Sequence, residues 1–341
     1  MTVRVTDIAR VAGVSTATVD RVLNKRQGVS DRTSERVRQA LERLQELEAA
    51  ELEGRIGPRP QSKSFDFLIP AGTEFFLDEM AAAVTAKKDE FALAGVEPRA
   101  HRIQGFDPAA IAAQIRSAAE ASDGLAVVAI DHPLVREAIN AAMAGGVPVV
   151  TLVSDISSSR RLGYVGVDNL AAGRLAGYLM GRFLGARKGS VALIAGSLTY
   201  RGHAERELGF RRVLREDFPQ LKIIDAREAQ DENDLSFRAA RDLLKSNSEL
   251  IGIYNIGGGS PGVAQALVDA KRADTVFIAH ELNPATRELA VRGVLDAIIN
   301  QNAGQEIAGA IRMLLNHHSG RDLDANLDPV RIEVFFRENL P

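Results

Sequence analysis

The chain has 341 residues, which exceeds the usual size of one small domain and predicts two or three compact units. It contains no cysteine, which excludes disulfides, thiolate metal sites and cysteine nucleophiles. No stretch approaches the roughly 18 uninterrupted apolar residues of a membrane helix. No secretory signal pattern opens the sequence, so we expect a cytoplasmic protein without a membrane partner.

The net charge of −3 is unevenly distributed along the chain. Residues 1–45 carry nine Lys and Arg side chains against five Asp and Glu, a net charge of +4, so the remainder of the chain carries −7. A basic N-terminal segment on an acidic body is typical of a protein that approaches a polyanion through one end.

Residues 5–45 predict three short helices. Thr6 can cap the first helix, and Gly13 then permits the positive φ of a tight corner. Ser15 can cap a second helix, and Ser30 begins a third. The apolar positions that we expect to be buried are Ile8, Ala9, Val11, Ala12, Val19, Val22, Leu23, Val37, Leu41 and Leu44. Three short helices with a glycine turn between the first two make a helix-turn-helix unit, although small three-helix bundles also serve as docking modules.

The stretch "VTDIARVAGVSTATVDRVLN…GVSDRTSERV" resembles the DNA-binding head of the LacI/GalR (lac-repressor) family of bacterial transcription regulators, over about the first 45 residues. The resemblance implies that Thr16, Ala17 and Arg21 reach base edges in the major groove. Positions 17 and 21 lie one helical turn apart, and an arginine can pair bidentately with a guanine. The hydroxyl side chains nearby suit phosphates, which set register without reading sequence. The expected DNA contacts are Thr6, Ser15, Thr16, Ala17, Thr18, Asp20, Arg21, Asn24, Ser30 and Thr33.

Two features depart from the family pattern. Asp20 stands where a serine is usual; it can accept from a cytosine amino group or orient Arg21, and a solvated residue paired with Arg21 is the open alternative. The stretch "LQELEAAELEGRIGPRPQSKS" lacks the family's tyrosine-x-proline-asparagine segment before its hinge helix. This stretch sets four acidic side chains where phosphates would lie, namely Glu46, Glu48, Glu51 and Glu53. Its wedge candidates for the minor groove are Leu47, Leu52 and Ile56, and its linker signals are Gly57, Pro58 and Pro60.

From Ser64 onward, short apolar runs alternate with longer helical patterns. The runs are "FDFLIP", "LAVVAI", "VPVVTL", "SVALIAG", "LIGIYN", "TVFIAH" and "LDAIIN", and the C-terminal "PVRIEVFFRENLP" predicts a final strand. Apolar strands without alternation, joined by amphipathic helices, predict parallel sheets covered on both faces. The fold class that we predict is an all-α helix-turn-helix head followed by an α/β effector domain of two lobes, each a parallel sheet flanked by helices.

Ligands of such sheets bind at the carboxyl ends of the strands. The residues that follow the runs are two aromatics and many hydrogen-bonding groups, a combination that suits a sugar because aromatic faces cover its C–H surface while polar groups bind its hydroxyls. Any single Asp or Asn among them can equally be a helix cap, and Phe75 and Phe76 can be core residues. The expected effector contacts are Phe75, Phe76, Asp131, His132, Ser154, Asp155, Tyr200, His203, Glu205, Arg206, Asn255, Glu281 and Gln301.

The body, residues 63–341, resembles the type I periplasmic sugar-binding fold that this repressor family uses as its effector domain. The resemblance implies a head at 1–45, a linker at 46–62, a first lobe at about 63–163 plus 297–326, and a second lobe at about 166–294 plus 329–341. It also implies ligand roles for Asn255, Glu281 and Gln301. The family's usual sugar-binding arginine aligns with Ala204, so His203, Glu205 or Arg206 must substitute.

Enzymatic signatures are absent from the sequence: it has no dinucleotide fingerprint, phosphate loop, nucleophile elbow or paired metal-binding histidines. "GGGSPG" at 257–262 predicts a tight strand-to-helix turn near the pocket. We expect no cofactor, no metal and no enzymatic activity. The sequence predicts a regulator, in the manner of a repressor, that binds palindromic operator DNA as a homodimer under control of a small sugar. A transport-type sugar-binding protein and a sugar or nucleoside enzyme are the alternatives.

Overall fold

A computed structural model of the chain describes residues 4–24, 26, 28–52, 62–71, 75–104, 107–224, 226–325 and 327–341. The chain divides into two compact units, Met1–Ser62 and Lys63–Pro341. None of the helices in the described part of the chain combines the length and the apolar character needed to span a membrane.

The first unit is a three-helix head. Its helices are α1 (Val5–Ala12), α2 (Thr16–Leu23) and α3 (Asp31–Leu52). Its buried core is made of Ile8, Ala9, Ala12, Val19, Val37 and Ala40, with Val14, Val22, Leu41 and Leu44 partly buried around it. Two predicted core positions are wrong, because Val11 and Leu23 are 37% and 40% exposed. Each of these helices has only eight residues, so the face that packs against the other helices includes fewer positions than the apolar residues of the sequence.

The turn between α1 and α2 has the predicted chemistry. Gly13 has φ +61°, a conformation that glycine adopts without the Cβ clash of other residues. Ser15 caps α2, because its Oγ accepts from the Thr18 backbone N–H at 3.2 Å. Thr6 was expected to cap α1, but α1 begins at Val5, so Thr6 lies inside the helix. The third helix was expected to end near residue 45 and instead continues to Leu52, into the sequence predicted as linker.

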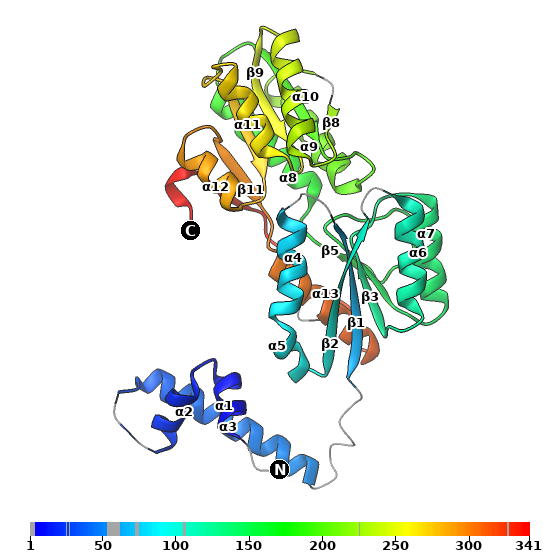
Figure 1. Cartoon of the computed structure of the whole chain (residues 1–341), viewed down its shortest axis with the longest axis vertical. Coiled ribbons are helices and arrows are strands. Elements are labelled where there is room, and N and C mark those ends of the chain that lie inside the picture. Colours follow the sequence, from blue (N-terminus) through cyan, green and yellow to red (C-terminus); the bar gives the residue numbers. More distant parts are fainter. Residues whose placement is uncertain are drawn as a thin grey trace. The chain divides into compact units, whose positions relative to one another are not determined.

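The second unit has two lobes, each built on one sheet. The first sheet has the order β2-β1-β3-β4-β5, entirely parallel, and its strands are β1 (Lys63–Ala71), β2 (Val96–Gln104), β3 (Gly124–Val127), β4 (Val149–Leu152) and β5 (Gly163–Val165). The helices of this lobe are α4 (Phe75–Ala86), α5 (Lys88–Leu93), α6 (Pro108–Ala119), α7 (Pro133–Ala144) and α13 (Ala303–His318). Figure 1 shows α6 and α7 together on one face of the sheet, with α4 and α13 on the other.

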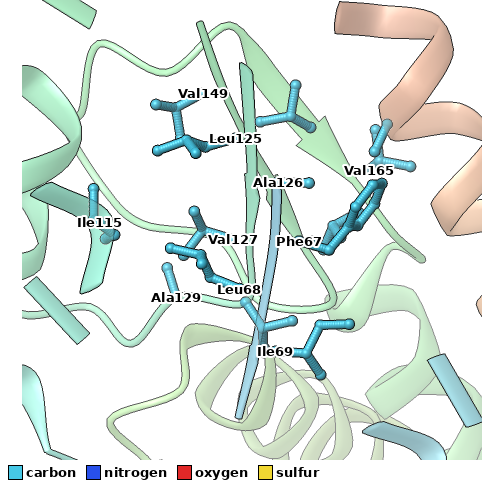
Figure 2. Close-up of a cluster of buried hydrophobic side chains, with 14 of the residues drawn as sticks. Phe67, Leu68, Ile69, Ile115, Leu125, Ala126, Val127, Ala129, Val149 and Val165 are labelled. Atoms are coloured by element: carbon cyan, nitrogen blue, oxygen red, sulfur yellow. The ribbon is translucent and has the colours of Figure 1, made fainter. Parts of the chain in front are cut away.

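The two faces of the first sheet are both apolar. Figure 2 shows Leu68 and Val127 directed to the side of Ile115 from α6, whereas Phe67 and Ala126 are directed to the opposite side. All of these side chains are buried. Because successive side chains of a strand point to opposite faces, a strand covered on both sides must be apolar at every position, as the run "FDFLIP" largely is.

The second sheet has the order β12-β11-β10-β9-β6-β7, with β8 also pairing with β6. Its strands are β6 (Gly189–Ala195), β7 (Leu221–Ile223), β8 (Arg227–Glu228), β9 (Leu250–Asn255), β10 (Val276–His280), β11 (Ala297–Asn300) and β12 (Glu333–Phe335). The helices of this lobe are α8 (Asn169–Leu184), α9 (Arg201–Asp217), α10 (Asn233–Ser246), α11 (Ser260–Asp269), α12 (Pro284–Val291) and the 3-10 turn η1 (Arg337–Asn339). The two-lobed α/β fold is therefore confirmed, with β12 as an antiparallel edge strand.

The chain returns to the first lobe later than the sequence predicted. Residues 297–300 were expected in the first lobe, but β11 pairs with β10 and β12 inside the second sheet. The crossing falls after Asn300, and α13 then packs on the first lobe. The prediction was wrong because the run "LDAIIN" is mostly apolar, and nothing in its local pattern tells which of the two sheets it completes.

Close contact between α8 and α9 requires glycine. A Cβ added to Gly209 of α9 would lie 2.2 Å from the Leu170 backbone oxygen, and one added to Gly173 of α8 would lie 2.0 Å from the Arg206 backbone oxygen. Both are contacts with backbone, which has little freedom to move away. The two helices therefore cross at a distance that alanine does not permit.

We predict that Gly209→Ala destabilises the protein by about 1–3 kcal/mol, because overpacking outweighs the gain of roughly 1 kcal/mol in helix propensity. Gly304→Ala on α13 is the matched control, since its added Cβ would first meet only the Asn302 side chain, at 3.3 Å. Urea unfolding at one pH measures both variants. A Gly209→Ala protein as stable as the control would contradict the close packing described for α8 and α9.

Candidate functional site

The outer surface of α2 carries short polar side chains and one long cation. Thr16, Ala17 and Arg21 are exposed, as the sequence predicted for side chains that face outward. The Arg21 guanidinium forms no hydrogen bond or ion pair with the described residues, so it is available to an external acceptor. The exposed arginines around it in the head include Arg4, Arg26, Arg32, Arg36 and Arg38.

Asp20 has other partners than the sequence predicted. Its carboxylate accepts from the Asn24 side-chain amide at 2.7 Å and pairs with Arg26 at 3.1 Å. The expected pairing of Asp20 with Arg21 is therefore wrong. Asp20 and Asn24 are occupied at the end of α2, where Asn24 also donates to the Asp20 backbone oxygen. Among the described residues, no carboxylate pairs with Arg21.

The hydroxyl side chains expected at phosphates lie at helix starts. Ser15 and Thr18 hydrogen-bond to each other at 2.9 Å at the start of α2, and Ser30 and Thr33 do the same at the start of α3. Helix N-termini present backbone N–H groups that favour anions. Thr6 is exposed on α1. The wedge and linker candidates Ile56, Gly57, Pro58 and Pro60, together with Glu53, lie outside the described residues, and the side chains of 46–52 are likewise not described.

In the second unit, polar side chains from both lobes meet at the carboxyl ends of the strands. They surround a small cavity with a free volume of ≈ 20 Å³, room for about one water. The cavity is lined by Leu77, Val128, Val153, Ser154, Tyr200, Gly202, His203, Arg206 and Gln301. Of the thirteen predicted effector contacts, five line it directly.

The lobes touch across this cavity. The Gly202 backbone N–H of α9 donates to the Ser154 hydroxyl at 3.2 Å, and Asp131 N–H donates to the Thr199 carbonyl at 2.9 Å. Tyr200, from the second lobe, is 7% exposed and packs into the first lobe's core. These contacts describe a closed cleft, so a ligand larger than a water requires the lobes to separate.

Arg206 is the cation of the cleft. It is 3% exposed, and its guanidinium donates to the Asn169 side-chain oxygen at 2.7 Å and to the Ile256 carbonyl at 2.9 Å. Both acceptors are neutral. Of the three residues named as possible substitutes for the family arginine, His203 and Arg206 are in the cavity lining, whereas Glu205 pairs with Arg201 at 2.7 Å.

The second sheet contributes a row of acidic and amide groups. Gln301 donates to the Glu281 carboxylate at 2.8 Å, and both side chains are 5% exposed. Burial raises the pKa of Glu281 to about 7, while the Arg206 guanidinium opposes that rise. Asn255 is fully buried and donates to the carbonyls of Gly257 and Gly258.

The glycine turn after β9 surrounds a buried aspartate. Asp231 has φ +58° and accepts from the Gly258 N–H at 2.7 Å, and burial raises its pKa to about 6. A Cβ added to Gly257 would lie 2.4 Å from the Asp231 carboxylate, and one added to Gly196 would lie 2.1 Å from it. "GGGSPG" is thus the strand-to-helix turn that the sequence predicted, and its glycines make room for Asp231.

Several predicted residues have structural roles in place of a position on the cavity. Asp131 accepts from Arg136 at 2.7 Å and from Ser157, His132 caps α7, and Asp155 pairs with Arg161. Phe76 is 2% exposed in the core of the first lobe, and Phe75 is 44% exposed. Neither phenylalanine lines the cavity within the described residues, and the adjoining segment 72–74 lies outside them.

Three residues of this region were not predicted. Asn169 links Arg206 to the first lobe, because its amide donates to the Val153 carbonyl at 3.2 Å and to the Tyr164 hydroxyl at 3.0 Å. Glu306 of α13 is fully buried, and burial raises its pKa well above its ordinary value. The third is Asp231, the buried aspartate beside the glycine turn, which accepts from the Gly258 N–H. A signal for Glu306 existed in the sequence, since an acidic residue interrupts the apolar face of the pattern "AGQEIAGAIRMLL".

Comparisons with known proteins agree with both units. Residues 65–322 match the family model of the periplasmic binding protein domain, and residues 4–45 match that of the bacterial regulatory proteins of the lacI family. No curated protein sequence matched the chain.

The similar solved structures include sugar-binding proteins and a protein assigned as a transcriptional regulator. GanP, a glucose-galactose binding protein from Geobacillus stearothermophilus, is 23% identical, with 83% of this chain and 100% of that chain covered and a TM-score of 0.75. A solute-binding protein of an ABC transporter from Burkholderia graminis, in complex with D-arabinose, is 22% identical, with coverage of 83% and 98% and a TM-score of 0.75. A protein assigned as a LacI transcriptional regulator from Bacteroides fragilis is 17% identical, with coverage of 82% and 98% and a TM-score of 0.72. At these identities the likeness establishes the fold.

The raised pKa of Glu281 gives a testable pH dependence. The folded protein holds this proton more tightly than the unfolded chain does, so its contribution to stability is complete below about pH 4.5 and is lost as the pH rises through about 7. Between pH 5 and 8 we expect the free energy of unfolding of the wild type to fall by roughly 1–3 kcal/mol more than that of Glu281→Gln. Urea unfolding at several pH values measures the difference. Glu288→Gln, at an exposed carboxylate, is the control and should follow the wild type.

Proposed function

Because the chain belongs to the periplasmic binding protein domain family through residues 65–322 and carries a head of the lacI family at residues 4–45, we propose that it is a ligand-responsive transcription regulator. In this proposal the head binds operator DNA, and the cleft binds a small sugar or sugar-like effector. The observation that carries the DNA-binding part is the Arg21 guanidinium, which has no partner among the described residues and lies on the exposed face of a capped helix after a glycine turn.

The head supports specific recognition as follows. Arg21 lies one helical turn from Ala17, and both are exposed, so they can enter the major groove together. The guanidinium suits the two acceptors of a guanine, and the small Ala17 and Thr16 suit thymine methyl groups. Ser15, Thr18, Ser30 and Thr33 lie at helix starts, where phosphate contacts set the register.

A symmetric homodimer is the assembly that we propose for DNA binding. One head of this size offers little surface for specific recognition, whereas two heads related by a twofold axis read a palindrome with half-sites about 34–36 Å apart, or a multiple of that spacing. A role in repression is the form of control that we expect from the family. We place the protein in the cytoplasm, because its DNA target lies there in bacteria.

The cleft supports a polar effector. Five side chains of its lining are buried and carry hydrogen-bonding groups, namely Ser154, Tyr200, His203, Arg206 and Gln301. In this proposal the cleft has a closed state and an open state, and a ligand can bind one more tightly than the other. A ligand shifts such an equilibrium only by its difference in affinity between the two states. We expect a coupling of about 1–3 kcal/mol, which changes operator affinity roughly 5- to 150-fold.

Sugar binding for transport is the second candidate, favoured by the solute-binding proteins among the similar structures. Selection from a random DNA pool discriminates between the two, with the full-length protein and a chain beginning near Ser62 compared at one salt concentration. We expect the full-length protein alone to enrich a palindrome. If neither protein enriches a sequence, the transport-type or sensing role is the better account.

Arg21→Ala should lower affinity for the selected palindrome roughly 5- to 150-fold, the equivalent of one bidentate base contact. Arg38→Ala is the matched control: its side chain is also exposed, but it pairs with Glu35 on α3 and should affect binding little. Fluorescence anisotropy with the palindrome and with a scrambled duplex measures both. Equal losses on the two duplexes would mean that Arg21 contacts phosphate and reads no base.

A further inference from the structure

Three neighbouring strands of the second sheet end in buried acceptor atoms that have no donor among the described residues. They are Asn255 Oδ1 after β9, Glu281 Oε2 after β10 and Gln301 Oε1 after β11. The amide nitrogens of Asn255 and Gln301 donate to other protein groups, which fixes the oxygens as the free atoms. Gln301 lines the cavity, Glu281 accepts from it, and Asn255 ends the next strand of the same sheet, so these three oxygens form a group of acceptors whose donors a ligand must supply.

Among the described residues near Arg206, buried carboxyl groups outnumber buried cations. Glu306 is fully buried and neither of its oxygens has a hydrogen-bond partner among the described residues. With Asp231 and Glu281 it makes three buried carboxyl groups near Arg206, whose guanidinium is the one buried cation that the described residues place there. That guanidinium lowers the pKa of each of the three, so all lie within its electrostatic reach.

The two buried histidines of this region add no positive charge. Burial lowers the pKa of His203 to about 3 and that of His280 well below its usual value, so both imidazoles are neutral. Glu79 adds further negative potential, since it raises the pKa of Glu281. Arg206 itself donates to two neutral oxygens in the cleft, Asn169 Oδ1 and the Ile256 carbonyl.

We infer that the effector is a polyol that bears a protonated amine, whose ammonium group donates to Glu281 and whose hydroxyls donate to Asn255 and Gln301. The inference rests on the proposed role of the cleft as the effector site and narrows the class of ligand. A neutral polyol can donate to the acceptors but brings no cation to stabilise the charged form of Glu281, whose pKa burial raises to about 7. A sugar phosphate or a sugar acid would place a negative charge beside Glu281 and oppose the ionisation of that carboxyl group further. An ammonium group forms charge-assisted hydrogen bonds, which are about twice as strong as neutral ones.

Matched pairs of ligands test the inference. Isothermal titration of the full-length protein at pH 7 compares glucosamine with glucose, galactosamine with galactose, mannosamine with mannose, and 1-amino-1-deoxysorbitol with sorbitol. We expect at least one amine to bind 10-fold or more tightly than its hydroxyl counterpart, and its N-acetyl derivative to lose that gain. If no amine in the series binds, or if neutral sugars or glucose 6-phosphate bind as tightly as the amines, the inference is wrong.

Two further measurements locate the interaction. Glu281→Gln keeps the hydrogen-bonding shape and removes the charge, so it should bring each amine and its counterpart to within about 3-fold; Glu288→Gln should leave the preference unchanged. An unchanged preference in Glu281→Gln would overturn the assignment. The second measurement needs no variant: the wild type is titrated in two buffers of different ionisation enthalpy. We expect Glu281 to release a proton when an amine binds and to release none when a neutral sugar binds.

The operator assay separates this inference from the proposed function. An amine that binds the cleft with the expected preference but leaves operator affinity unchanged contradicts the regulator and leaves the ligand class intact. A neutral sugar that binds more tightly and changes operator affinity supports the regulator and contradicts the ligand class.

Discussion

The buried guanidinium of Arg206 is the interaction on which the effector unit depends. A buried charge is stable only when its polar atoms have hydrogen-bond partners and an opposite charge lies nearby. Arg206 meets the first condition through Asn169 and Ile256, and the amide of Asn169 continues the chain of hydrogen bonds to Val153 and Tyr164 in the first lobe. The second condition is met in part by the carboxyl groups of Asp231, Glu281 and Glu306: burial raises the pKa of each, and the Arg206 guanidinium opposes that rise, so cation and carboxylates favour each other's charged forms. The two lobes are thus joined by a polar network, while their own cores are apolar.

Glycines set the positions of this network. Gly173 and Gly209 allow α8 and α9 to cross closely, and Arg206 belongs to the contacting part of α9, since its own backbone oxygen limits the approach to Gly173. Gly196 and Gly257 leave the space that the Asp231 carboxylate occupies. The positions of the charged groups therefore depend on these glycines. A side chain at any of them would displace backbone or the Asp231 carboxylate and would change the distances between the charged groups.

The sequence predicted the parts of the structure that depend on local pattern. The apolar runs correspond to β1, β3, β4, β6, β9, β10 and β11, because strands covered on both faces must be apolar. It did not predict β2, whose sequence "VEPRAHRIQ" is polar and contains Pro98, since an edge strand is covered less and tolerates both. Strand ends predicted Ser154, Tyr200 and Gln301 in the cavity lining. They could not predict Asn169 and Glu306, which reach the region from helices. The sequence also did not predict that Asp20 pairs with Arg26 and not with Arg21. Those depend on tertiary contacts that no local pattern encodes.

The unpartnered acceptors of the cleft bear on how a ligand could control the protein. A buried acceptor without a donor costs about 1–3 kcal/mol, so closure over Asn255, Glu281 and Gln301 is expensive until donors are supplied. A ligand that supplies them favours the closed arrangement more than the open one, and that difference is the only free energy available for a signal. The apolar cores lie within their own lobes apart from Tyr200 of the second lobe, which packs into the core of the first. The response to a ligand therefore depends on the polar residues between the lobes, where buried acceptors have no hydrogen-bond donor among the described residues.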